Sequence, residues 1–434
     1  MHLSLSRSLL VLACAALPLS AHAVDIQRWH TADGTQVLLV ARHDNPIVDV
    51  QISFKGAGAA FNPPGKGEVA DFTAAMLTDG TRTLDEEAFN ARANDLAADI
   101  GSSSSDEGAS IRLRSLSRAE VLQPALKLVN QSLTEPRFDA EVFRRRQNQS
   151  VTALQQSETD PAFVADRAAT LLDYPDHPYG SSARTSEQSL RAVTLADIRA
   201  FHRSRYGKNN AIVAVVGDID RRQTEALVQT VLAGLPAKSS RSAAVPPVPE
   251  RNAQRRDIPF AAEQAQIVMS MPLIRRDDPD YYALVVGNYI LGSGGFDGRL
   301  MKTLRDQYGY TYGAYSNLAP ATEAGAFSIA FSTQKANTAP ALAAAQKVLA
   351  DFVAEGPTEA ELQQAKSNLV GGFPLRFDTN AKLLQYLSLI GFYNLPDDYL
   401  EAYPKAVAAI SSAQIKAAWQ RRVQPQNMNI VVVG

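Results

Sequence analysis

The chain has 434 residues, of which 45% are hydrophobic and 20% are charged. This is the composition of a folded globular protein, and the length predicts two or more packed domains. The formal net charge is −2 and the sequence has no block of clustered lysine and arginine. These features argue against a nucleic-acid-binding surface, which needs such clusters to replace counterions.

The first 23 residues have the features of a secretory signal peptide. Arg7 supplies a positive charge, residues 8–16 form an apolar run, and residues 21–23 (AHA) form a small-x-small cleavage site. The run is shorter than the ~20 residues that a membrane span requires. Cleavage after Ala23 would remove Cys14, the only cysteine, so the exported chain would have no disulfide. We therefore predict a periplasmic protein with no membrane segment after cleavage.

Two segments near the start of the expected mature chain have clear periodicity. Residues 44–58 (DNPIVDVQISFKGAG) alternate apolar and polar residues and predict a β-strand. Residues 65–83 (GKGEVADFTAAMLTDGTRT) predict a short helix between glycine-containing turns. On that helix Asp71, Ala74 and Ala75 share one face, because residues three and four positions apart are neighbours on a helix surface.

An internal repeat is the strongest organisational feature of the sequence. Residues 205–217 (RYGKNNAIVAVVG) and 422–434 (RVQPQNMNIVVVG) each have a basic start, an Asn-containing turn and an apolar strand that ends in Gly. A helical segment precedes each of them. Thr194 is the predicted N-cap of the first helix, and Ser411 or Ser412 is that of the second.

The beginnings of the two halves also correspond. Residues 261–274 (AAEQAQIVMSMPLI) repeat the alternating pattern of residues 44–58. Residues 236–257 are rich in Pro, Ser and charge and have almost no periodic apolar pattern, which predicts a linker. The expected domains are therefore residues 24–235 and 258–434.

Strands and long helices are mixed within each half. Residues 339–355 and 359–368 are clear helices, whereas residues 100–117 (IGSSSSDEGASIRLRSLS) are extended. We predict an α+β fold with two homologous α/β-sandwich halves, each an antiparallel-rich sheet with helices, joined by the linker.

The expected mature chain has few residues that support catalysis. Its histidines include no pair three or four residues apart that could hold a metal from one helix face. It has no G-x-S-x-G nucleophile elbow, and no cysteine remains after signal cleavage. The four histidines are His30, His43, His177 and His202.

Several landmarks, taken in order, resemble the pitrilysin/insulinase family of zinc peptidases. They are FKGAG at 54–58 with the helix that follows it, HPYG at 177–180, LADIRAFHRSRYGKNNAIVAVVGDI at 195–219, and YILGSGGFDGRLMKTLRDQYGYTYGAYS at 289–316. The resemblance covers both halves, and its motifs are specific in combination. It implies that the two halves are arranged as a clam shell.

Active members of that family carry H-x-x-E-H on the helix of the first half, where the two His bind Zn²⁺ and the Glu is the general base. The matching residues here are Asp71, Ala74 and Ala75, which read D-x-x-A-A. The family's third ligand, a Glu on a later helix, falls near Thr152 and Ala153. The resemblance therefore implies no zinc site in this chain, and Asp71 is either a weak lone ligand or a solvated helix residue.

The second half of the family contributes an Arg and a Tyr to substrate handling, and Arg305 and Tyr312 match them. The resemblance implies that the guanidinium holds peptide carbonyls and that the phenol donates a hydrogen bond to the developing oxyanion. Tyr308, Tyr310 and Tyr312 alternate, so packing on one face of a strand is the alternative interpretation.

Some relatives, such as the mitochondrial processing peptidase, are two-chain enzymes in which one chain has the zinc site and the other has the Arg/Tyr pair. This chain resembles the second type. The resemblance implies that it has no cofactor of its own and is inactive alone. It also implies a zinc-bearing homologous partner, unfolded peptides as substrate, and peptide pairing along residues 100–117, which could equally be a surface β-hairpin. The alternative is a structural or peptide-binding scaffold, as in the core subunits of respiratory complexes.

Overall fold

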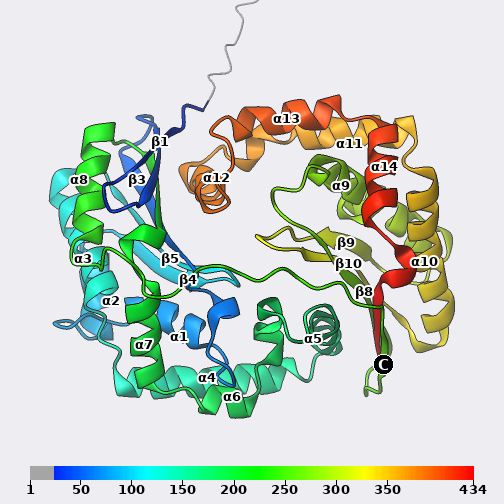
Figure 1. Cartoon of the computed structure of the whole chain (residues 1–434), viewed down its shortest axis with the longest axis horizontal. Helices are drawn as coiled ribbons and strands as arrows, with labels where there is room; N and C mark the ends of the chain where they lie inside the picture. The colour runs from blue at the N-terminus through cyan, green and yellow to red at the C-terminus, as the bar shows by residue number, and fades with distance from the viewer. Residues whose placement is uncertain (1–23) are drawn as a thin grey trace, which may run out of the picture.

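The computed structural model describes residues 24–434, so the predicted signal peptide lies outside the described residues. The strands form two mixed sheets, one in each half of the chain (Figure 1). The first sheet contains β1 (Gln27–His30), β2 (Gln36–Ala41), β3 (Ile47–Lys55), β4 (Asp99–Ser104), β5 (Gly108–Leu116) and β6 (Ala211–Gly217). The second contains β7 (Arg255–Ile258), β8 (Gln264–Ile274), β9 (Ala314–Leu318), β10 (Gly325–Gln334) and β11 (Asn429–Val433).

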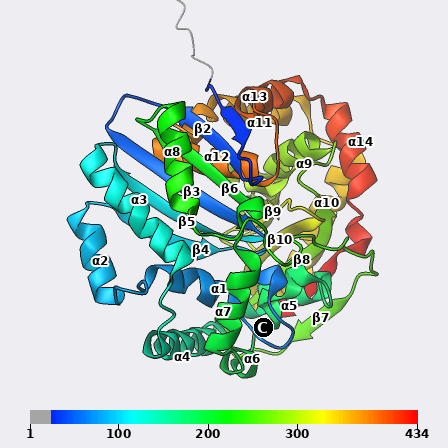
Figure 2. The ribbon, with the colours of Figure 1, turned by 60° about the vertical axis from the view of Figure 1, so that its left-hand side comes forward.

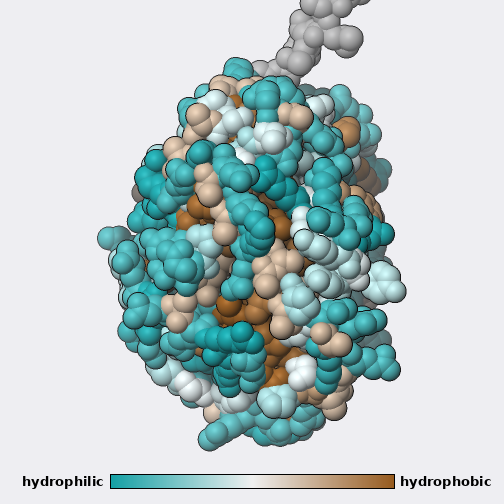
Figure 3. Space-filling view, turned by 90° about the vertical axis from the view of Figure 1, so that its right-hand side faces the viewer, coloured by the Kyte–Doolittle hydropathy of each residue, from teal (hydrophilic) through white to brown (hydrophobic). Residues whose placement is uncertain are grey.

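Helices surround both sheets. Those of the first half are α1 (Val69–Ala75), α2 (Glu86–Asp95), α3 (Ala119–Thr134), α4 (Ala140–Ser157), α5 (Pro161–Asp173), α6 (Glu187–Arg191), α7 (Leu195–Arg205) and α8 (Arg221–Leu232). Those of the second half are α9 (Tyr281–Asn288), α10 (Thr338–Glu355), α11 (Glu359–Gly371), α12 (Asn380–Phe392), α13 (Tyr399–Ala409) and α14 (Ser412–Arg422). Between residues 24 and 434, no helix has both the length and the apolar character needed to cross a membrane. The side of the second half that Figure 3 presents is mostly hydrophilic, with hydrophobic residues visible in narrow seams.

The two sheets repeat one strand pattern. The first sheet has the order β1-β2-β6-β3-β5-β4 and the second has the order β7-β11-β8-β10-β9. Each sheet contains one parallel pair, β2 with β6 in the first and β7 with β11 in the second. From that pair onward, the remaining three pairings are antiparallel: β6–β3, β3–β5 and β5–β4 in the first sheet, and β11–β8, β8–β10 and β10–β9 in the second. The repeated segments of the sequence are β6 and β11, and the matching alternating segments are β3 and β8. The predicted α+β fold with two homologous halves is therefore confirmed.

Local capping explains where the helices before β6 and β11 begin. The Thr194 hydroxyl accepts a hydrogen bond from the Asp197 amide, and the Asp197 carboxylate accepts one from the Thr194 amide, which forms a capping box at α7. Ser411 forms the same box with Gln414 at α14. The predicted N-cap at Thr194 is thus confirmed, and Ser411, not Ser412, caps the second helix.

Each half places one helix on the sheet of the other half. α12 lies against β6, β3 and β2, and α5 lies against β8 and β11 (Figures 1 and 2). Gly391 allows the close approach of α12, because a Cβ there would lie 2.7 Å from Leu38 and 2.8 Å from Ile212. All seven residues of β6 are buried, since both faces of the strand are covered. Such strands read as continuous apolar runs, as AIVAVVG does.

A buried carboxylate joins the two halves at the turn between β4 and β5. Glu107 is 7% exposed and accepts hydrogen bonds from the Tyr179 hydroxyl (2.6 Å), the Tyr393 hydroxyl (2.9 Å) and the Thr322 amide (3.1 Å). Tyr179 belongs to the first half, whereas Tyr393 and Thr322 belong to the second. Burial and the hydrogen bond to Glu107 raise the pKa of Tyr179, so the phenol remains a donor. These contacts and the exchanged helices fix how the halves face each other.

Candidate functional site

The helix with the altered motif, α1, is now a packing element. Val69, Phe72 and Ala74 are buried in the core of the first half. Asp71 is partly buried, and its carboxylate accepts a hydrogen bond from the Ser104 hydroxyl on β4. Asp71 is therefore only partly solvated, and its side chain also ties α1 to the edge of the first sheet.

Three of the four histidines of the described chain, His43, His177 and His202, have structural contacts. His43 pairs with Asp218 at 2.7 Å, and His177 and His202 each contact a backbone carbonyl. Burial lowers the pKa of His202 to about 4, so this imidazole is neutral at physiological pH. Within residues 24–434, no group of three or more His, Cys, Asp or Glu side chains is placed to hold a metal ion.

The segment of α4 that the resemblance matches to the family's third ligand is mostly exposed. Thr152 and Ala153 are both exposed. Ser150, in contrast, is partly buried and hydrogen bonds to the Glu68 carboxylate at the start of α1. Burial raises the pKa of Glu68, and the hydrogen bond from Ser150 partly offsets this effect. Of these three residues of α4, Ser150 is therefore the one that contacts the start of α1.

Arg305 and Tyr312 lie in the second half, on a turn of π-helix (η8, Met301–Gln307) and in the loop after it. The Arg305 guanidinium lies 4.8 Å from the centroid of the Phe296 ring, and it forms no ion pair with any described residue. Tyr312 is 87% exposed. Within residues 24–434, neither side chain forms a hydrogen bond to α1, so the structure does not bring the two groups of predicted site residues together.

The tyrosines around Tyr312 do not line a strand. Tyr308 and Tyr310 stack on each other with ring centroids 5.3 Å apart, and β9 begins only at Ala314. The alternative interpretation of a packed strand face is therefore wrong for residues 308–312.

Exposed aromatic rings are concentrated in residues 296–315, which we call the aromatic segment. Four of the five large hydrophobic side chains that are strongly exposed in the described chain belong to it. They are Phe296 (69%), Tyr308 (49%), Tyr312 (87%) and Tyr315 (51%), and the fifth is Leu375 (66%). Gathered exposed apolar groups are typical of surfaces that another molecule covers.

A cavity of about 310 Å³ lies between the edge of the first sheet and α12. Its walls include Ser103, Ser104 and Ser110 from the β4–β5 hairpin and Phe392 from α12. β4 is the edge strand of its sheet, so residues 100–117 are both a hairpin and a free sheet edge. An edge strand offers unpaired backbone groups to which an extended peptide can add.

Glu107 is a residue that sequence analysis missed. Its place in the D-E-G turn between two strands is typical of an exposed residue, and nothing local indicates that Tyr179 and Tyr393 will enclose it. Only the non-local packing of the two halves makes it a buried acceptor.

Comparisons with known proteins place the chain in a family. A solved structure described as a peptidase M16 inactive domain, from Pseudomonas fluorescens, is 34% identical, covers 94% of this chain and 98% of its own, and has a TM-score of 0.90. The chain belongs to the peptidase M16 family. The family model described as the peptidase M16 inactive domain matches residues 192–369. The predicted resemblance to this family of zinc peptidases is thus confirmed, and the matching model and structure are those of its inactive domain.

Two further relatives extend the comparison. A Helicobacter pylori protein named non-peptidase homolog YmxG is 23% identical over 403 residues, which is 92% of this M16 chain and 91% of that protein. The structure of the periplasmic protease PqqL from Escherichia coli has a TM-score of 0.79 at 18% identity. It covers 100% of this chain and 48% of PqqL, and at this identity it shows a shared fold alone.

Proposed function

We propose that this M16 chain is a catalytically incomplete subunit that pairs with a zinc-bearing homologue in the periplasm and forms a peptide-degrading metallopeptidase with it. The observation that carries the proposal is the exposure of Tyr312 on the aromatic segment, which also contains Arg305, a residue without an ion-pair partner among residues 24–434. A tyrosine that is 87% exposed contributes little to this chain's own core and is free to enter another chain's site.

The two chains would contribute different catalytic groups. The partner would supply Zn²⁺ and the general base. In this chain, the Tyr312 phenol would donate a hydrogen bond to the oxygen that gains negative charge on the scissile carbonyl. The planar Arg305 guanidinium would hold backbone carbonyls of the peptide, and Phe296 beneath it would limit its orientations.

A non-catalytic scaffold that binds peptides is the second candidate. The free edge of β4 and the adjoining serine-lined cavity favour it, because both would serve peptide binding without cleavage. The name of the Helicobacter pylori relative, a non-peptidase homolog, is consistent with it.

The decisive experiment measures cleavage of a mixed pool of unfolded peptides by the chain, by a zinc-bearing homologue from the same genome, and by the two together. We expect only the pair to cleave. In the pair, Tyr312→Phe is expected to lower the rate by about 10²- to 10³-fold, the effect of removing one oxyanion donor.

Tyr315→Phe is the matched control, because Tyr315 is also exposed and belongs to the same segment. It should leave the rate unchanged. Co-migration of the two chains in size-exclusion chromatography would show that Tyr312→Phe still pairs. If the homologue is equally active alone, or if both variants keep the full rate, the scaffold function replaces the enzymatic one.

A further inference from the structure

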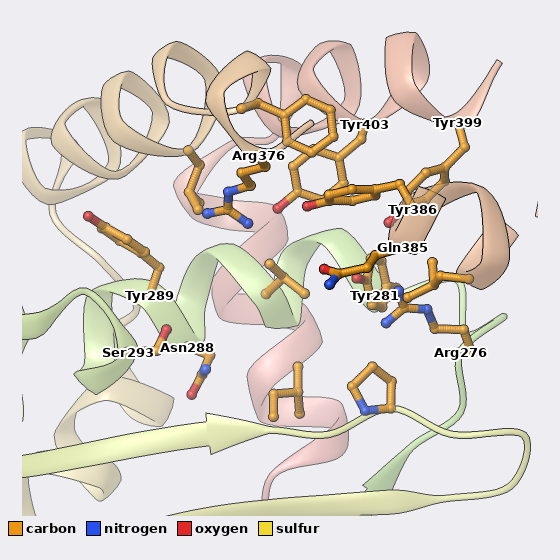
Figure 4. Close-up of a pocket in the computed structure, with 16 residues that line it drawn as sticks. Arg276, Tyr281, Asn288, Tyr289, Ser293, Arg376, Gln385, Tyr386, Tyr399 and Tyr403 are labelled. Atoms are coloured by element: carbon orange, nitrogen blue, oxygen red, sulfur yellow. The ribbon is translucent and has the colours of Figure 1, made fainter. Parts of the chain in front are cut away.

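The second half contains a cavity of about 500 Å³ that the proposed catalytic role leaves unused. Its walls come from α9, α11, α12, α13 and the turn after α9, with the end of β9 beneath them (Figure 4). The lining includes two arginines, Arg276 and Arg376, five tyrosines, and no Asp or Glu. A wall with two cations and no carboxylate creates a positive potential that attracts anions.

Arg276 differs from its neighbour Arg275 in a way that points to a ligand. Arg275 pairs with Asp277 at 3.0 Å and with Glu323 at 3.7 Å. Arg276 is partly buried, and its guanidinium contacts the faces of Tyr281 (5.2 Å) and Tyr393 (5.5 Å) without any carboxylate partner among the described residues. Two aromatic rings hold this guanidinium, which leaves its N–H fork available for a planar carboxylate.

Two other polar side chains of the cavity, Tyr403 and Asn288, are available to form hydrogen bonds with a ligand. Burial raises the pKa of Tyr403 to about 12, so its phenol stays protonated and can donate. The side-chain amide of Asn288 is 6% exposed and forms no hydrogen bond with the described residues. Figure 4 shows Arg376 and Arg276 entering the cavity from opposite sides, with Gln385 between them.

The cavity continues toward the edge of the first sheet. Gln385 and Leu389 of α12 line both this cavity and the smaller one beside β4. A chain that pairs with β4 can therefore pass over α12 and place its end among the arginines and tyrosines.

We propose that this cavity is a binding site for a peptide carboxylate, in which Arg276 and Arg376 hold the anionic group and the tyrosines contact an adjacent apolar side chain. The carboxylate belongs either to the peptide's C-terminus or to an acidic side chain. The inference rests on the peptide-binding part of the proposed function, and it needs neither the partner chain nor cleavage.

Binding of short fluorescent peptides to the mature chain alone, measured by anisotropy, tests the site. The first peptide has neutral side chains, an aromatic last residue and a free C-terminal carboxylate; the second is its C-terminal amide; the third is the amide with one internal Glu. We expect the first or the third to bind about tenfold or more tighter than the second, the effect of a charge-assisted hydrogen bond. The tighter binder identifies the source of the carboxylate. Equal binding of all three overturns the proposal.

Arg276→Gln is expected to remove this preference, and the matched control is Arg275→Gln. Both variants lose one positive charge at adjacent positions, but Arg275 already has carboxylate partners. Arg376→Gln, at an exposed position, should weaken carboxylate binding without affecting folding. An equal loss of affinity in the two adjacent variants, or no loss in either Arg276→Gln or Arg376→Gln, would overturn the site. Because no partner takes part, these outcomes are independent of the peptidase proposal.

Discussion

Helix α1 and the aromatic segment are the two regions in which this chain resembles peptidase machinery, and their burial is opposite. In α1, the residues around the lost ligands are buried, as Phe72 (3% exposed) and Ala74 (1%) show. In the aromatic segment, Tyr312 is 87% exposed. A side chain that no longer binds a metal is free to improve packing, whereas an exposed tyrosine has no such role. The difference shows that the first region is part of the core of its half, and it supports our proposal that the second region interacts with another chain.

Rebuilding the metal site in α1 should have the largest effect. A variant with Asp71→His, Ala74→Glu, Ala75→His and Ser150→Glu is expected to bind about one zinc ion per chain, because it restores two imidazoles and a carboxylate on facing helices. Metal content after dialysis measures this. The control carries Thr152→Glu in place of Ser150→Glu and should retain much less zinc. Equal zinc in both proteins would contradict the expectation that position 150 is better placed than position 152 to complete the site.

Truncating one aromatic side chain in each region tests their roles in stability. Phe72→Ala should lower the free energy of unfolding by about 3–5 kcal/mol, because it leaves a cavity beside Phe143, whose ring centroid lies 5.6 Å away. Tyr312→Ala should change it by less than about 0.5 kcal/mol. Urea denaturation measures both. A large loss with Tyr312→Ala would mean that the aromatic segment is part of the core, and the comparison would fail.

The last prediction concerns the pH dependence of stability and rests on His202 in the first half. Burial lowers its pKa from 6.5 to about 4, so the unfolded chain binds more protons than the folded chain between these values. Stability from this group is complete above about pH 6.5 and is lost as the pH falls toward 4, by up to about 1.4 kcal/mol per pH unit.

His202→Gln isolates this contribution when the unfolding free energies of both proteins are measured from pH 7 to pH 4. The variant should lack the slope, and its amide can still donate to the Leu133 carbonyl that contacts the imidazole. Asp173, whose pKa burial raises to about 6, has the opposite slope but is present in both proteins, so it cancels in the difference. Identical slopes would show that His202 titrates normally.

The sequence by itself determined the features that depend on neighbouring residues. The apolar run of β6, the alternating pattern of β3 and the capping residues Thr194 and Ser411 all act within one strand or one helical turn, so their patterns can be read directly. The absence of paired histidines is equally local. These local features predicted that the chain has two halves with the same fold and that the motif helix of the first half has no zinc ligands.

The tertiary structure alone decided the features that join distant residues. No local pattern indicates that α12 will cover the first sheet, that Glu107 will meet Tyr393, or that Ser150 will contact Glu68. Helix spacing fixes which residues share a face, but the rotation of that face toward a partner depends on packing. Likewise, the cavity around Arg276 exists only because four helices converge on it, and no one of them contains the pattern of the site.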